Sequence, residues 1–414
     1  MGWTDGAPPH TVGVVPRSSH TSAGPGPQDR AAIAGLGMTP MTRAFVKSEL
    51  ELADDAVRLA VEDAGLTLDD VDGLLVNAAS PTVNGMGLQS RMGLKNLRML
   101  YQIQQYGSTA GAMIQYASLA VASGMAETVA CVFTDVPITG KTLRYAQTRE
   151  LSGMAGVEQA SGLIGANPRY AFAARRHMLE YGTTTEHFGA VAVSQRTWAE
   201  KNPLAVAREP MTLDDHARSR WVVEPFRLFD ICFVVNGAIA VIVTTDQKAR
   251  SLKQPPVYLW GWGQAHPGII QERDSQFGLR SGAITSGREA FAMAGIGVQD
   301  VEIAEIYDCY TYTVLVTMED YGFCAKGEGG PFAASGAMGR DGSIPTNTGG
   351  GQLSGYYMWG MTPVSEAIIQ ARGQGGERQV ERNNVILVSG NGGILDYHST
   401  LIMSPNPRTP SMIA

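Results

Sequence analysis

Apolar and polar positions along the chain form blocks that predict strands and helices in turn. Residues 31–38 (AAIAGLGM) are a short apolar run ending in a glycine turn, as in a buried strand. In residues 50–65 apolar side chains recur at helical spacing, and the opposite face is acidic. Residues 71–76 return to an apolar run. The ordered chain is therefore expected to begin as a β–α–β unit.

The same reading continues downstream. Residues 108–124 predict an almost wholly apolar helix suited to burial, and residues 129–134 (VACVFT) predict a core strand. The longest apolar run, 231–245, is shorter than the roughly 18 residues of a membrane-spanning helix. It is also interrupted by Asn-Gly, so we interpret it as a buried strand with its approach turn. A helix over 363–373 and a strand over 384–389 complete the pattern.

One local pattern occurs twice. Residues 64–72 (AGLTLDDVD) resemble residues 294–302 (AGIGVQDVE), and each copy follows a predicted helix and leads into an apolar strand. This repeat predicts two duplicated α/β halves. Residues 135–230 are more polar, aromatic and irregular, and we expect an inserted region there. Residues 1–30 are rich in Pro, Gly, Ser and Thr and predict a poorly ordered extension.

Composition narrows the function classes. The 414 residues carry 32 basic and 39 acidic side chains, a net charge of −7 without a concentrated basic face, which disfavours nucleic-acid binding. Four widely spaced cysteines form no metal-binding pattern and indicate a reducing compartment. No basic segment followed by an apolar stretch opens the chain, so the cytoplasm is the expected location, with neither a membrane nor a metal involved.

Two glycine- and tyrosine-rich segments carry the candidate chemistry: Glu305–Thr311 (EIYDCYT) and Asn347–Thr362 (NTGGGQLSGYYMWGMT). The second resembles the thiolase superfamily turn Asn-x-x-Gly-Gly-x-Leu-Ser-x-Gly-His-Pro-x-Gly-x-Thr, and the match puts Tyr357 at the histidine position. The first resembles the superfamily's Asn-Glu-Ala-Phe-Ala, or the His-Asp-Cys-Phe of sterol-carrier-type thiolases. That match puts Tyr307 at the catalytic Asn or His position.

The nucleophile position has also changed. The segment Tyr106–Gly111 (YGSTAG) resembles the superfamily's Cys-Ser-Thr-Gly turn, and the cysteine position falls on Gly107. Glycine has no side chain to form the acyl-enzyme of Claisen chemistry. The final glycine turn, Ser389–Gly393, has no cysteine either. An ordinary thiolase or ketoacyl synthase is therefore disfavoured.

The resemblance implies an α/β thiolase fold of two βαβαβαββ halves in five layers, αβαβα, with an inserted loop domain. Its boundaries would be an extension over 1–30, an N-terminal half over 31–254 with the loop domain at about 135–230, and a C-terminal half over 255–414. It also implies a homodimer, which we expect to pair through an edge strand around Val129–Thr134.

Two tyrosines suit a particular reaction. A neutral tyrosine, with a pKa near 10, is a good proton donor. Retro-aldol cleavage of a β-hydroxyacyl thioester takes a proton from the β-hydroxyl, breaks the Cα–Cβ bond and returns a proton to Cα, without a covalent intermediate. The enolate oxygen needs donors, and backbone at Gly107, at a helix start, and at Gly392 or Gly393 is the candidate. The sequence leaves open which glycine of that turn donates.

Taken together, these segments resemble the thiolase-like aldolases of bacterial sterol side-chain catabolism. The resemblance implies that Tyr307 and Tyr357 are the acid/base pair. It also implies a 17-hydroxy steroid substrate with a three-carbon acyl-CoA side chain, cleaved to a 17-ketosteroid and propionyl-CoA. No cofactor is expected beyond the CoA of the substrate. A small OB-fold, zinc-ribbon partner linked to an acyl-CoA hydratase is implied as well.

Other interpretations stay open. A one-residue slip would exchange Tyr356 for Tyr357. For the neighbouring residues we expect that Tyr310 packs in the core, Asp308 organises its loop and Cys309 is inert. Asp396 and His398 could orient a tyrosine, contact the substrate or lie at the surface. The chain could instead be a non-catalytic acyl-CoA or lipid carrier, or an acyltransferase subunit of a thiolase-like complex, although the latter should keep a cysteine at Gly107.

Overall fold

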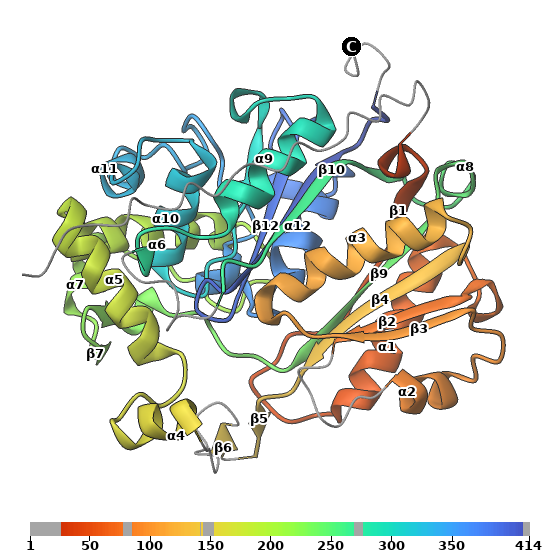
Figure 1. Cartoon of the computed structure of the whole chain (residues 1–414), viewed down its shortest axis with the longest axis horizontal. Helices are drawn as coiled ribbons and strands as arrows, with labels where there is room; N and C mark the ends of the chain where they lie inside the picture. Colours follow the sequence, from red (N-terminus) through yellow and green to blue (C-terminus); the bar gives the residue numbers. More distant parts are fainter. Residues whose placement is uncertain (1–25, 78–84, 141, 144–152, 269–275, 409–414) are drawn as a thin grey trace, which may run out of the picture.

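The computed structural model describes residues 26–77, 85–140, 142–143, 153–268 and 276–408 (Figure 1). One sheet of nine strands runs through these residues in the order β11-β12-β13-β10-β1-β9-β4-β2-β3. The first half-sheet contains β1 (Ala31–Met38), β2 (Gly73–Asn77), β3 (Met99–Ile103), β4 (Thr128–Asp135) and β9 (Gly237–Thr245). The second contains β10 (Val257–Ala265), β11 (Ile303–Glu305), β12 (Ile386–Gly392) and β13 (Tyr397–Ser404).

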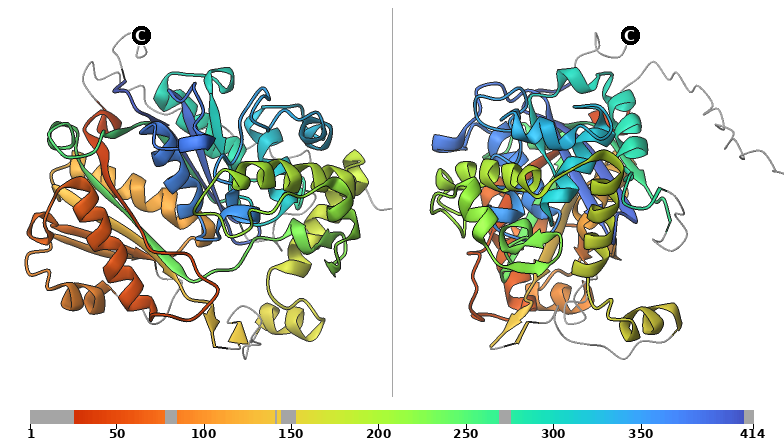
Figure 2. Two further views of the ribbon diagram at one scale, coloured as in Figure 1. Left: turned by 180° about the vertical axis from the view of Figure 1, so that it is seen from behind. Right: turned by 90° about the vertical axis from the view of Figure 1, so that its left-hand side faces the viewer.

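Helices separate and cover the two half-sheets. The two central helices are α3 (Thr109–Ala122) and α12 (Met361–Ala371), and their apolar side chains share one core with β4 and β9 on one side and β12 and β13 on the other. The outer face of the first half-sheet packs on α1 (Glu49–Ala64) and α2 (Gly85–Met92). The outer layer of the second half contains α9 (Ala283–Ala294) and α10 (Thr311–Tyr321). Figures 1 and 2 show these layers, which form the expected αβαβα arrangement.

The predicted duplication is present in detail. Both α1 and α9 end at a left-handed glycine, Gly65 and Gly295, each with φ 74°, and each is followed by a 3-10 turn and a strand. In both halves a helix also lies close to a glycine-containing strand. A Cβ on Gly37 of β1 would lie 2.1 Å from the Ala56 carbonyl oxygen, and one on Gly261 of β10 would lie 2.3 Å from the Ala290 carbonyl oxygen. The pairings match as well, with β2 parallel to β4 and β11 parallel to β12.

The inserted region is helical and joins the second half through buried polar contacts. It contains α4 (Gly153–Ala160), α5 (Asn167–Tyr181), α6 (Thr185–Glu200), α7 (Leu213–Arg218) and the hairpin of β7 (Trp221–Val223) and β8 (Phe226–Arg227). His177 of α5 lies 3.0 Å from the Glu319 carboxylate of α10, and both are fully buried. His216 lies 2.8 Å from Asp230, which also accepts from the Thr311 hydroxyl. The loop domain is therefore fixed against the helix that follows Tyr307.

The remaining short elements are the β5–β6 hairpin (Ile138–Thr139 and Thr142–Leu143), α8 (Asp246–Ala249) and α11 (Gly329–Ala334).

Two expectations from the sequence need correction. The strand around Val129–Thr134 is β4, which lies between β9 and β2 inside the sheet, so the edge of that half is β3. Residues 26–30, the described end of the expected extension, form a turn in which Asp29 pairs with Arg408 at 2.8 Å; residues 1–25 lie outside the described part. Among the described residues, no helix is long and apolar enough to cross a membrane.

Candidate active site

The two tyrosines at the superfamily's catalytic positions meet in the interior. Tyr307 lies in the turn after β11, and Tyr357 follows the single π-helical turn Gly351–Gly355. Their hydroxyl oxygens are 3.2 Å apart, within hydrogen-bonding distance. Their side chains are only 3% and 8% exposed. Two segments 50 residues apart in sequence therefore bring two phenols together at one buried site.

Backbone-directed hydrogen bonds hold these two segments together. The buried Asp308 carboxylate accepts from the backbone N–H groups of Gln352 and Leu353, at 2.9 and 3.2 Å. The Asn347 side chain accepts from the Ile306 N–H at 2.6 Å. The approach to β9 passes between the segments, since residue 231 pairs with Tyr310 and residue 234 pairs with Tyr357. Asp308 thus has the organising role expected of it.

Gly107 shows why no cysteine occupies the nucleophile position. It lies in the 3-10 turn Tyr106–Ser108 that leads into α3. A Cβ at Gly107 would lie 2.2 Å from two ring atoms of Tyr307 and 2.2 Å from the Asn391 carbonyl oxygen. The phenol of Tyr307 fills the space that a side chain at residue 107 would need. The Asn391 carbonyl oxygen excludes a side chain there equally closely.

The final glycine turn lies against the same helix start. A Cβ at Gly392 would lie 2.0 Å from the Gln105 carbonyl oxygen, so only glycine allows this close approach. Gly393 has φ 63°, a left-handed conformation. Asp396 closes the turn, accepting from the Ile394 N–H at 3.1 Å. The structure therefore places Gly107 against the Tyr307 ring and Gly392 against Gln105 and Tyr106, and Gly393 follows in the same turn.

Backbone strain is concentrated around the tyrosine pair and the glycine turns. Four non-glycine residues of the described chain have positive φ: Tyr106, Asn347, Trp359 and Leu395, with φ between 50° and 65°. Each lies within two residues of Gly107, Tyr357 or the glycine turn, or at the start of the segment that carries Tyr357. Such conformations cost on the order of 1–3 kcal/mol each and persist where the surroundings impose them, often at functional sites.

Burial determines the electrostatics of the site. Removal from water raises the pKa of Tyr307 well above its ordinary value, although the hydrogen bond with Tyr357 acts in the opposite direction. Tyr307 is therefore a neutral phenol near pH 7. Burial also raises the pKa of the Cys309 thiol to about 12, which fits the inert role expected of it. The pKa of Asp308 is raised by burial to about 7, despite the N–H groups that favour its charged form.

The structure places the other candidate residues, Tyr356, Tyr310 and His398, in distinct surroundings. Tyr356 points away from the pair, and its hydroxyl lies 2.9 Å from that of Ser365 in α12. Tyr310 packs against Tyr170 and Phe226, with ring centroids 4.5 and 4.9 Å away, in agreement with the expected core position. His398 is not at the surface as one reading expected: it is fully buried between Ser389 and Tyr321, at 3.0 and 3.1 Å. Burial lowers its pKa to about 3.

The sequence analysis did not single out three residues that lie near the tyrosine pair or the final glycine turn. The ring of Trp359 stacks on Tyr357 with centroids 5.7 Å apart. Tyr170 of α5 donates to the Gly393 carbonyl oxygen at 2.8 Å, and the Asn391 side-chain amide donates to Tyr170 at 3.2 Å. Trp359 and Asn391 lie within the recognised segments Asn347–Thr362 and Ser389–Gly393, but Tyr170 comes from the loop domain and carries no motif that marks it.

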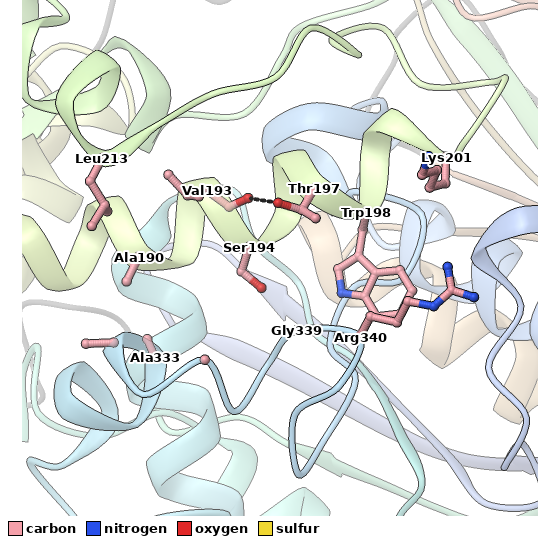
Figure 3. A pocket seen from close by; sticks show the side chains of 12 residues that line it. Ala190, Val193, Ser194, Thr197, Trp198, Lys201, Leu213, Ala333, Gly339 and Arg340 are labelled. Atoms are coloured by element: carbon pink, nitrogen blue, oxygen red, sulfur yellow. Dashed lines mark hydrogen bonds between the residues drawn. The ribbon is translucent and has the colours of Figure 1, made fainter.

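A separate cavity of about 330 Å³ lies between α6, α7 and the segment Ala333–Arg340 (Figure 3). Its lining includes Ala190 and Ser194 of α6, Lys201 just after that helix, and Arg340 from the facing loop. Neither tyrosine of the pair lines it. The described residues contain no cluster of three or more His, Cys, Asp or Glu side chains that would hold a metal.

The raised pKa of Asp308 predicts a pH-dependent contribution to stability. Its folded-state pKa, about 7, exceeds the ordinary 3.8, so the folded protein binds this proton more tightly than the unfolded chain. The contribution of Asp308 to the free energy of unfolding should therefore fall as pH rises from about 4 to about 7. We expect the difference in unfolding free energy, wild type minus Asp308→Asn, to be larger at pH 5 than at pH 8. Denaturant titrations at both pH values measure it, and an equal difference would contradict the prediction.

Comparison with known proteins agrees with this geometry. Residues 261–405 match the family model for a thiolase C-terminal domain. The chain is 35% identical over 381 residues to a steroid side-chain-cleaving aldolase of Thermomonospora curvata, covering 87% of this chain and 95% of that protein. It is 36% identical over 375 residues to the 17-hydroxy-3-oxo-4-pregnene-20-carboxyl-CoA lyase of Mycobacterium tuberculosis, covering 88% and 97%. The chain belongs to the thiolase-like steroid side-chain aldolases.

Solved structures extend the comparison. A chain of the Ltp2–ChsH2(DUF35) aldolase superposes with a TM-score of 0.83 at 34% identity, covering 91% of this chain and 98% of that one. Human mitochondrial 3-ketoacyl-CoA thiolase, at 14% identity and a TM-score of 0.65, shares the fold. As a member of the aldolase family, the protein is an enzyme of the carbon–carbon lyase class.

Proposed function

We propose that the protein cleaves a β-hydroxyacyl-CoA thioester by a retro-aldol reaction. The proposed substrate is a 17-hydroxy steroid with a three-carbon CoA side chain, and the products are a 17-ketosteroid and propionyl-CoA. The observation that carries the proposal is the buried Tyr307–Tyr357 pair, with hydroxyls 3.2 Å apart, in place of a nucleophile. The names of the two relatives, a side-chain-cleaving aldolase and a steroid carboxyl-CoA lyase, support this substrate class.

In the proposed mechanism both tyrosines remain neutral. Tyr307 accepts the β-hydroxyl proton while its own proton passes to Tyr357, and Tyr357 delivers a proton to Cα. The O–H bonding electrons form the new ketone, and the Cα–Cβ electrons form the enolate that is protonated. Because burial raises the pKa of Tyr307, a free tyrosinate would be costly in this pocket. A relay through the 3.2 Å contact avoids that charged state.

The enolate oxygen requires fixed donors. We propose that the backbone at Gly107, in the turn that opens α3, and at the Gly392–Gly393 turn surrounds it. The helix start favours negative charge, and glycine lets a thioester approach the backbone closely. The large contribution of such preorganised donors to catalysis explains how a cleavage can proceed without a covalent intermediate.

Partners remain part of the proposal. The Ltp2–ChsH2(DUF35) structure supports a second subunit, for which we propose a small OB-fold, zinc-ribbon protein associated with an acyl-CoA hydratase. We also propose a homodimer. Its pairing edge in the first half-sheet would be β3 rather than β4, because β4 has strands on both sides.

The direct test is an assay of the purified chain, with and without the partner subunit, on the steroid CoA ester. We expect equal amounts of ketosteroid and propionyl-CoA by mass spectrometry, and weak turnover by the chain alone. A straight-chain 3-hydroxyacyl-CoA serves as the non-steroid control. Binding of the ester without cleavage, even with the partner, would favour a non-catalytic carrier. Full turnover without the partner would remove the need for that subunit.

A further inference from the structure

Tyr170 connects the loop domain to the glycine turn in a directional chain of hydrogen bonds. Its hydroxyl donates to the Gly393 carbonyl oxygen at 2.8 Å and accepts from the Asn391 side-chain N–H at 3.2 Å. A tyrosine hydroxyl has one hydrogen, so donation to Gly393 requires that Asn391 present its nitrogen to Tyr170. The orientation of the Asn391 amide is therefore fixed by Tyr170.

With the amide in that orientation, its oxygen is a buried acceptor without a donor among the described residues. The Asn391 Oδ1 atom has no hydrogen-bond donor among the described residues, and Asn391 is only 1% exposed. The backbone carbonyl of the same residue lies against Gly107, where a Cβ would be 2.2 Å away. A buried acceptor without a partner is costly, by about 1–3 kcal/mol, and is usually satisfied by a ligand or water. Near the reacting centre of the proposed substrate only the β-hydroxyl can donate, because the thioester and enolate oxygens accept, so that hydroxyl or a bound water is the natural partner of Asn391 Oδ1.

Tyr170 itself is held by packing. It is 2% exposed, and its ring lies 4.5 Å from that of Tyr310. Tyr310 in turn donates to Asn167, one turn before Tyr170 on α5. The ring can therefore stay in place when only its hydroxyl is removed.

We propose that Tyr170 is a positioning residue, which holds Asn391 and the Gly392–Gly393 turn in the conformation that binds the thioester. This inference rests on the proposed function, because the turn is where the enolate is expected to form. The loop domain thereby takes part in catalysis. Its helix α5 sets the geometry of a turn 223 residues later in the sequence.

The test compares Tyr170→Phe with a matched control in the full chain with its partner subunit. Tyr170→Phe keeps the ring and loses both hydrogen bonds. The control, Tyr312→Phe, also loses a buried tyrosine bond to a backbone carbonyl, at Gly278 and 2.7 Å, away from the turn. We expect Tyr170→Phe to lower kcat by about 10- to 100-fold, since small misplacement of reacting groups costs on the order of 10²-fold. KM should change much less, and Tyr312→Phe should lose thermal stability while keeping its kcat.

Two further readouts separate positioning from general destabilisation. Deuterium exchange at Cα of propionyl-CoA reports the enolate step alone, and it should slow in Tyr170→Phe but not in Tyr312→Phe. Asn391→Ala should lower kcat similarly, and the double variant should be no worse than the more impaired single one, because both act through one chain of bonds. Equal kcat in Tyr170→Phe and wild type, or fully additive losses, would overturn the inference. If wild type neither cleaves nor exchanges, the proposed function fails first and this role falls with it.

Discussion

Replacing either Tyr307 or Tyr357 with phenylalanine should lower turnover by about 10²–10⁴-fold, the usual contribution of a general acid–base group. Each variant loses one hydroxyl of the 3.2 Å pair and keeps a ring of the same shape. Both should therefore fold, with near wild-type thermal unfolding. Cys309→Ala is the matched control from the same segment: its thiol pKa is raised to about 12 by burial, so it offers no thiolate and its loss should cost little.

The roles of the two tyrosines can be separated by isotope exchange. We assign Tyr357, at the superfamily's histidine position, to proton delivery at Cα, and Tyr307 to the β-hydroxyl. Exchange of propionyl-CoA in deuterated water needs the group beside Cα in every event, so it should be lost in Tyr357→Phe. It should be slowed less in Tyr307→Phe, where a water molecule can replace the Tyr307 hydroxyl as the relay partner of Tyr357. The reverse pattern would exchange the assignments. Unchanged steroid cleavage in both variants would exclude tyrosine acid–base catalysis altogether.

The second large effect is expected at Gly107. In Gly107→Ala the new Cβ would overlap the Tyr307 ring and the Asn391 carbonyl, each at 2.2 Å. Overpacking of this kind costs about 1–3 kcal/mol, occasionally more. Relief requires that both the Tyr307 ring and the Asn391 backbone shift, so we expect about a 10²-fold loss of turnover, the scale of a 1 Å misplacement at a reacting centre. Steady-state kinetics and thermal unfolding together measure both consequences.

Gly124→Ala is the control for this substitution. Gly124 has φ 74°, so alanine is strained there, but no neighbouring atom lies within 4 Å of the new Cβ. It should lose stability and keep activity. Gly107→Cys places a cysteine at the superfamily's nucleophile position. It should nevertheless show no thiolase activity, because the Tyr307 ring occupies the space that the cysteine side chain would need. Wild-type turnover in Gly107→Ala would show that the Tyr307 position is not tied to the missing side chain.

The sequence by itself predicted the main elements and the two tyrosines proposed as the acid–base pair. The strand over 31–38 matches β1, and the helix expected over 50–65 is α1 within one residue at each end. These predictions succeed because periodicity and glycine turns are local signals. The motif match also placed Tyr307 and Tyr357 at corresponding catalytic positions, and their hydroxyls indeed meet.

Only the tertiary structure decided which residues surround that pair. The order of strands in the sheet made β4 internal, because pairing depends on contacts between distant segments rather than on local pattern. His398 is buried for the same reason. The exclusion of a side chain at Gly107 by Tyr307, across 200 residues of sequence, is a steric fact that no spacing reveals. Tyr170 reaches the glycine turn because the loop domain packs against the second half. Burial there strengthens its hydrogen bond, because the interior has a low dielectric constant.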